Sequence, residues 1–211
     1  MSSCCHSQQP RFEGLSPAYQ RVLWLVIAIN FSMFLAEMIA GQLAGSRALQ
    51  ADSLDFAGDS LTYAISLAVI GRPLLVRSWA ALFKAGSLLL LGFWVAGSTL
   101  WSIWNGQLPE AHVMGIFAVL ALTANLVSLF LLMRWRDGDA NIRSVWLCSR
   151  NDALANLAVL FAAFGVFGTA AAWPDLLVAG IMSMLFLSSA WQILRQALAE
   201  RREALQLLAV E

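Results

Sequence analysis

Residues 50–63, QADSLDFAGDSLTY, place three carboxylates inside a segment that otherwise has the composition of a membrane-spanning helix. Successive residues of an α-helix turn by about 100°, so Asp55 and Asp59 project only ~40° apart and Asp52 lies on the same side. Carboxylates inside a bilayer are costly, and they usually mark pathways for ions or protons. The stretch therefore predicts a metal or proton site on one face of a helix.

The composition of the whole chain indicates a membrane protein. Its 211 residues are 60% hydrophobic and only 12% charged, with a mean hydropathy of +0.71, whereas a soluble domain of this size carries about a quarter charged residues. The 13 basic and 13 acidic side chains balance, so no basic surface remains for a nucleic-acid partner. The three cysteines form no disulfide framework and do not indicate a redox compartment.

Six apolar runs are each long enough to cross a hydrocarbon core of ~30 Å as a helix. They are residues 19–44, 48–70, 79–104, 111–133, 145–173 and 174–198. The runs are too long and too uniformly apolar for barrel strands, and backbone groups in lipid must be paired within the segment. We therefore predict an all-α membrane protein, a six-transmembrane-helix bundle over residues 19–198. A polar N-terminal tail, 1–18, precedes it, and a short amphipathic tail, 199–211, follows and could extend the last helix.

The basic residues predict how this bundle is oriented. Most of them, Lys84, Arg134 and Arg143 included, lie in or near connections that share one side if both termini lie there too. The positive-inside rule places that side in the cytoplasm. Because the start of the chain lacks the apolar core of a signal peptide, the first run is predicted to be a retained span. We expect a multi-pass protein of a bacterial inner membrane with both termini cytoplasmic.

The first predicted span carries two polar residues, Asn30 and Glu37, which are seven residues apart and hence within ~20° of each other on the helix. Such side chains point at protein and not at lipid. For Asn30 the favoured explanation is a hydrogen bond between helices, and the alternative is an accessory role in moving protons or cations. For Glu37 two roles stand, a packing hydrogen bond or the movement of protons or cations, because an ionisable group is costlier in the membrane than an amide.

The fifth predicted span brings a thiol and a carboxylate to one face, because Cys148 and Asp152 are four residues apart, with Asn151 alongside. Set against Asp55 and Asp59, this pair would complete a set of three oxygen donors and one sulfur donor. That set suits a tetrahedral divalent ion such as Zn²⁺. A buried cysteine alone is more often a small hydrophobic residue than a ligand, so the register with Asp152 carries the argument.

The polar N-terminal tail contains Cys4, Cys5 and His6, a cluster of soft metal ligands that could capture metal ions or be a tail without function. The chain has only two histidines, His6 and His112, and no Ser, His and Asp at the spacing of a hydrolase. The sequence therefore argues against an intramembrane enzyme.

Four motifs together resemble the cation diffusion facilitator family of metal–proton antiporters, in the family's order and spacing. They are Asn30 and Glu37 followed by Gly41-x4-Ser46-x-Ala48-Leu49-x-Ala51-Asp52, the second-helix motif Asp55-x3-Asp59, Asn141-Ile142-Arg143 followed by Cys148-x3-Asp152, and Trp173-Pro174-Asp175 opening the last helix. The resemblance covers most of the chain from the first span onward.

The resemblance implies efflux of a Zn²⁺- or Cd²⁺-like ion in exchange for protons, with the metal as transported substrate and no prosthetic group. Asp55, Asp59, Cys148 and Asp152 stand at the family's ligand positions, and Asp52 then belongs to the exit path or supports the ligands. Three carboxylates and a thiolate outweigh the charge of a divalent ion, so an empty site should hold protons that the metal displaces.

Two departures from the family pattern matter. Cys148 stands where the family usually has histidine, and this softer ligand should favour Cd²⁺ or Zn²⁺ over Mn²⁺. The family's cytoplasmic C-terminal domain is missing, so we expect a short form, with any homodimer formed through the transmembrane helices. The alternative is a metal-binding membrane sensor or partner subunit that does not transport.

Overall fold

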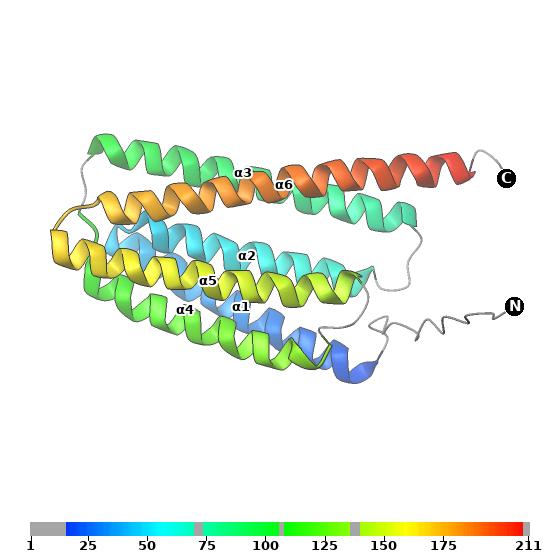
Figure 1. Cartoon of the computed structure of the whole chain (residues 1–211), viewed down its shortest axis with the longest axis horizontal. Helices are drawn as coiled ribbons and strands as arrows, with labels where there is room; N and C mark the ends of the chain where they lie inside the picture. The colour runs from blue at the N-terminus through cyan, green and yellow to red at the C-terminus, as the bar shows by residue number, and fades with distance from the viewer. Residues whose placement is uncertain (1–15, 70–73, 106–107, 136–139, 209–211) are drawn as a thin grey trace, which may run out of the picture.

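The computed structural model describes residues 16–69, 74–105, 108–135 and 140–208, and this part of the chain is helical throughout its regular elements, without strands. The elements are α1 (Pro17–Ala44), α2 (Arg47–Ala68), α3 (Leu74–Asn105), α4 (Ala111–Leu132), the 3₁₀ turn η1 (Met133–Trp135), α5 (Ala140–Thr169) and α6 (Trp173–Leu208). The prediction of an all-α bundle of six long helices is confirmed (Figure 1).

The two ends of the described chain lie at the same end of the bundle. Figure 1 shows the start of α1 and the end of α6 both toward the right-hand end of the bundle, as an even number of antiparallel passes requires. The side of the membrane on which they lie stays a prediction. Residues 1–15, and with them Cys4, Cys5 and His6, lie outside the described residues.

The boundary between the last two helices differs from the predicted one. α5 ends at Thr169 because Ala170 takes a φ of 49°, in the left-handed region, which breaks the helical hydrogen-bond ladder. α6 begins at Trp173, and Pro174 in its first turn needs no amide partner there. α6 then continues to Leu208, so the amphipathic tail does extend the last helix over its described length.

Five of the helices are long and apolar enough to cross a membrane, and they account for all predicted spans except the second. They contain the segments Pro17–Ala44, Ser78–Asn105, Ala111–Trp135, Asp152–Thr169 and Trp173–Ala199. Large apolar side chains on them are exposed, as for Leu43 at 82% and Trp104 at 81%. Faces of this kind are typical of contact with lipid.

The remaining helix, α2, is not apolar enough to be counted among these candidate spans. Its position in the bundle explains its lower hydropathy. It contacts each of the other five helices, and none of its large apolar side chains is exposed. Surrounded by protein, α2 does not have to present an apolar surface to lipid, so carboxylates and serines are tolerated along it. Figure 1 shows α2 running alongside α5 within the bundle.

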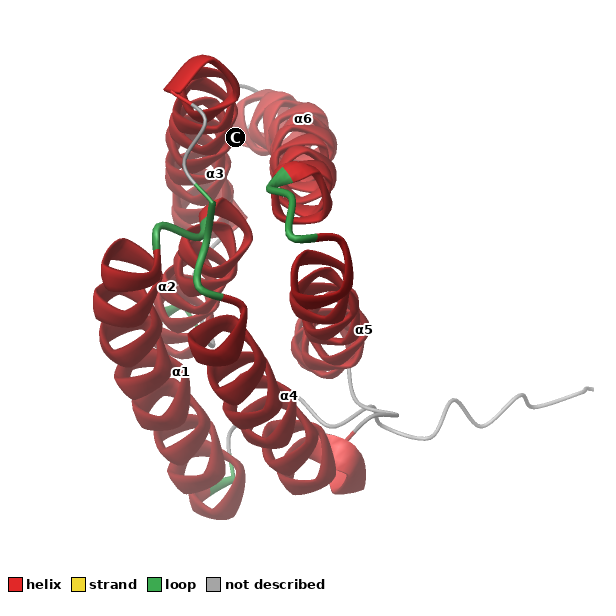
Figure 2. Cartoon of the chain, turned by 90° about the vertical axis from the view of Figure 1, so that its left-hand side faces the viewer, coloured by secondary structure: helices red, strands yellow, loops and turns green. Residues whose placement is uncertain are grey.

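The helices form two groups. α3 and α6 make the most extensive pairwise contact, and the second group consists of α1, α2, α4 and α5, joined through the pairs α1–α2, α4–α5 and α1–α4. Figure 2 shows the α3–α6 pair on one side of the bundle and the other four helices on the opposite side. The pair meets the second group mainly through α2 and α5, and this seam is where the candidate site lies.

A carboxylate of α6 ties the start of α2 to the bundle. Gly45 ends α1 with a φ of 65°, which favours glycine, and Ser46 is the N-cap of α2. Asp175 accepts a hydrogen bond from Ser46 Oγ at 2.6 Å. It also accepts bonds from the backbone amides of Arg47 at 2.8 Å and Ala48 at 3.0 Å. A carboxylate at a helix N-terminus is favoured by the helix dipole, so these residues, here called the Asp175 clamp, hold α2 against α6.

Candidate metal site

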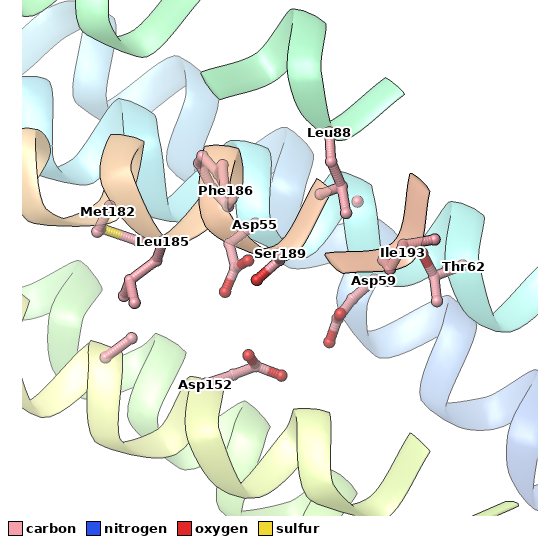
Figure 3. A pocket seen from close by; sticks show the side chains of 12 residues that line it. Asp55, Asp59, Thr62, Leu88, Asp152, Met182, Leu185, Phe186, Ser189 and Ile193 are labelled. Atoms are coloured by element: carbon pink, nitrogen blue, oxygen red, sulfur yellow. The ribbon is translucent and has the colours of Figure 1, made fainter. Parts of the chain in front are cut away.

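A cavity of about 220 Å³ lies at the seam between the two helix groups. Its polar lining consists of Asp55, Asp59 and Thr62 of α2, Asp152 of α5 and Ser189 of α6. Leu88 of α3 and side chains of α6 such as Met182, Leu185 and Phe186 supply the apolar lining. Figure 3 shows the three aspartates facing one another across this cavity, with α6 along one side.

The structure brings together the acids that the sequence placed on two separate helices. Asp55 and Asp59 lie one turn apart on α2, and Asp152 of α5 is within hydrogen-bond reach of both carboxyl groups. Two carboxylates can share a hydrogen bond only if one of them carries a proton. The cavity thus gathers acidic oxygens that either hold protons or share a cation.

Asp59 has two further neighbours on the side of the cavity toward the end of α2. Tyr63 donates a hydrogen bond from its hydroxyl to Asp59 Oδ2 at 2.6 Å. Lys84 of α3 attracts the Asp59 carboxylate electrostatically and donates to Ser66 Oγ at 2.8 Å. From the sequence, Lys84 was noted only as a basic residue near a connection, and its contacts with Asp59 and Ser66 of α2 were not predicted.

The four predicted ligands are not all described. Cys148 lies within α5, one turn before Asp152, but its side chain and that of Asn151 lie outside the described residues. Within the described part of the chain, no three His, Cys, Asp or Glu side chains form a group that could hold a metal ion. The aspartates face a common cavity without forming a closed coordination shell, and metal ligation by Asp55, Asp59 and Asp152 stays a prediction.

A second acidic pair lies outside the cavity, between α1 and α2. Glu37 is 0% exposed and Asp52 is 1% exposed, and their carboxyl groups are within hydrogen-bond reach of each other. Among the described residues no donor reaches either oxygen of Glu37 or Oδ2 of Asp52. The pair can therefore hydrogen-bond only with a proton between its members, which keeps both roles considered for Glu37 open.

Asn30 differs from its predicted role. Its side-chain nitrogen donates to the carbonyl oxygen of Val26 at 2.8 Å, one turn earlier on the same helix. The expected hydrogen bond between helices is therefore replaced by a bond within α1, because the amide side chain reaches its own helix's carbonyl group. Asn30 is 1% exposed and does not line the cavity.

The contacts of two residues near the site, Tyr63 and Asp175, were not predicted from the sequence. Tyr63 follows Asp59 by four residues, so the helical spacing alone could have paired them. Asp175 was noted only as part of a Pro-Asp motif, and its contact with α2 joins residues more than a hundred positions apart. No local pattern predicts that contact.

Comparison with known proteins shows where this chain has relatives. Residues 76–200 match the family described as the cation efflux transmembrane domain. The metal cation efflux system protein CzcD of Cupriavidus metallidurans is 25% identical over 191 residues, which cover 85% of this chain and 60% of that protein. The zinc transporter ZitB of Escherichia coli (strain K12) is 26% identical over 196 residues, which cover 87% of this chain and 63% of that protein.

A further relative is the zinc transporter ZitB of Yersinia pestis, 26% identical over 194 residues, which cover 86% of this chain and 62% of that protein. The chain therefore spans about three fifths of the length of these curated relatives.

Proposed function

Because this chain belongs to the cation efflux family, we propose that it moves a divalent, Zn²⁺-like metal ion out across a membrane in exchange for protons. Membership confirms the resemblance that the sequence motifs indicated. The observation that carries the proposal is the cavity at which Asp55, Asp59 and Asp152 converge. The names of the relatives, a metal cation efflux system protein and zinc transporters, agree with this substrate class.

The three aspartates would supply oxygen ligands to the metal, and Cys148, one turn before Asp152 on α5, would supply sulfur. Zn²⁺ takes four ligands of this kind in a tetrahedral arrangement. The carboxylates and a thiolate together exceed the charge of one divalent ion, so protons occupy the site when the metal leaves it. Exchange of metal for protons follows from this competition.

The position of the cavity supports a transport role. It lies where α3 and α6 meet the other four helices, and its lining comes from both groups. A small rotation of one group against the other would change which end of the cavity is open, while ligands on α2 and α5 move together. Rigid-body rocking around a site of this kind is the general mechanism of alternating access.

The chain is an integral multi-pass membrane protein. We place it in the inner membrane of a bacterium, because the relatives come from bacteria, and we expect it to contact a second copy through its transmembrane helices. Metal ions and protons are its substrates in this proposal, and the lipid bilayer is its surroundings.

Reconstitution of the purified full chain in liposomes tests the proposal. With an imposed pH gradient, Zn²⁺ flux should saturate, and protons should cross the membrane in the opposite direction to the metal. Asp55→Asn and Asp152→Asn should each abolish flux and proton release, because each removes a charged ligand while keeping the side-chain volume. Glu110→Gln is the matched control, since Glu110 is exposed and its side chain makes no capping hydrogen bond.

Full retention of coupled flux in both aspartate variants would contradict the assignment of the site. Zn²⁺ binding that requires the aspartates but produces no flux in the wild-type chain would instead support the sensor or partner subunit.

A further inference from the structure

Tyr63 lies directly beside one of the cavity's carboxylates without lining the cavity itself. Its side chain is 0% exposed, and its hydroxyl donates to Asp59 Oδ2 at 2.6 Å. The same hydroxyl lies 3.3 Å from Ser149 Oγ of α5, within hydrogen-bond distance. Ser149 is itself 1% exposed. The phenol therefore joins the ligand-bearing helices α2 and α5 next to Asp59.

This contact makes the two oxygens of Asp59 unequal. Oδ2 accepts a short hydrogen bond from a neutral donor that is held in place by its own helix and by Ser149. A bond to an ionised acceptor is about twice as strong as a neutral one. A metal bound through both oxygens would share Oδ2 with the phenol, which weakens that oxygen as a ligand because part of its charge already serves the hydrogen bond. Oδ1 is therefore the stronger ligand oxygen for a metal.

The number of oxygens that a carboxylate supplies affects which ion fits. Zn²⁺ takes four ligands in a tetrahedron, which suits carboxylates that bind through one oxygen. Ions such as Mn²⁺ prefer six oxygen ligands, and carboxylates that bind through both oxygens help to reach that number. A hydrogen bond that weakens one oxygen of an aspartate as a ligand therefore disfavours the six-coordinate ion more than the four-coordinate one.

We propose that Tyr63 is a positioning residue that biases Asp59 toward binding a metal through one oxygen and so favours a four-coordinate ion such as Zn²⁺ over a six-coordinate ion such as Mn²⁺. The proposal rests on the proposed function, since it concerns the metal preference of the same site. It adds a selectivity element that is independent of the softness of Cys148, because the phenol acts through coordination number and the thiolate through ligand type.

Equilibrium competition on the purified full chain tests this role. Radioactive Zn²⁺ bound to the protein is displaced by increasing Mn²⁺, and the ratio of the two affinities is compared between variants. Tyr63→Phe removes only the hydroxyl. The preference for Zn²⁺ over Mn²⁺ should fall about tenfold, the factor that corresponds to losing one hydrogen bond to a charged group.

Two other variants make the result specific. Tyr19→Phe removes the hydroxyl of the only other tyrosine. Tyr19 is equally buried and belongs to the same hydrophobic cluster as Tyr63, but it does not line the cavity, so this variant should leave the preference unchanged. Ser149→Ala keeps the phenol but removes its second neighbour, so the preference should fall in the same direction by a smaller factor.

The outcomes separate the two proposals. If Tyr63→Phe binds Zn²⁺ with an unchanged preference, or weakens both ions equally, Tyr63 only supports the fold and the inference is wrong. If Tyr63→Phe does not fold, Ser149→Ala decides, and an unchanged preference in it overturns the inference. A wild-type chain that binds neither ion contradicts the proposed function itself.

Discussion

Aspartates lie at both the start and the middle of α2, one supplied by α6 and the others by α2 itself, but their surroundings differ. At the start, Asp175 of the Asp175 clamp accepts three hydrogen bonds from Ser46, Arg47 and Ala48. In the middle, Asp55 and Asp59 lie beside Asp152, a third carboxyl group, around a cavity.

The two arrangements distinguish acids that stabilise the fold from acids that could bind a cation. A buried carboxylate that is surrounded by donors stabilises the fold and has no need for a cation. Carboxyl groups that mainly face one another destabilise each other unless a proton or a metal ion lies between them. The clamp should therefore matter for stability and the cavity for binding.

The largest effect is expected from breaking the clamp. Asp175→Ala leaves the hydroxyl of Ser46 and two amides of α2 without their acceptor in a buried place, and we expect the free energy of unfolding to fall by about 3 kcal/mol. Asp55→Ala should change it by less than about 1 kcal/mol, because it removes a carboxyl group that lies beside other carboxyl groups. Thermal unfolding of the purified chain in detergent measures both. Equal losses in the two variants would contradict the distinction.

A glycine at the clamp end of α1 provides the next test. A Cβ at Gly41 would lie 3.0 Å from both Cγ and the backbone nitrogen of Gln50. Gly41→Ala should therefore push α1 and α2 apart and lower the free energy of unfolding by about 2 kcal/mol. Gly86→Ala is the matched control, because a Cβ there meets nothing within 4 Å and alanine favours the helix. An unchanged free energy of unfolding in Gly41→Ala would show that the two helices adjust without loss of stability.

The pH dependence of metal binding tests whether protons and metal compete for the carboxylates of the cavity. Protons and metal compete for the same oxygens, so the metal is released as the pH falls and bound more tightly as it rises. Each displaced proton should strengthen apparent Zn²⁺ affinity by up to about tenfold per pH unit. Titration calorimetry at several pH values measures this slope. The slope should be the same in Ser46→Ala, and a flat slope in the wild-type chain would contradict proton exchange.

The smallest effect is expected from one bond of the clamp. Ser46→Ala removes the hydroxyl that donates to Asp175 at 2.6 Å and accepts from the Leu49 amide at 3.0 Å, but two backbone amides still bind Asp175. The free energy of unfolding should fall by about 1 kcal/mol, as for other N-caps, and the same unfolding experiment measures it. A loss as large as that of Asp175→Ala would mean that the hydroxyl, and not the carboxylate as a whole, holds the clamp.

The sequence predicted the helices well because each depends on local features. Long apolar runs indicate helices in a membrane, and all six predicted runs have a helix in the structure. The end of α5 was predicted four residues too late, since the turn at Ala170 follows from backbone angles at an alanine, which no residue type there signals. The apolar composition also did not show that α2 is enclosed by the other five helices.

The acidic face of α2 was determined by the sequence itself, because Asp55 and Asp59 are four residues apart and helical geometry alone puts them on one side. Which side chains of other helices lie against that face depends on the tertiary structure. Asp152 joins the two from α5, while Asp175 binds the start of α2. Spacing along a chain sets contacts within a helix, whereas contacts between helices depend on how side chains far apart in sequence pack together.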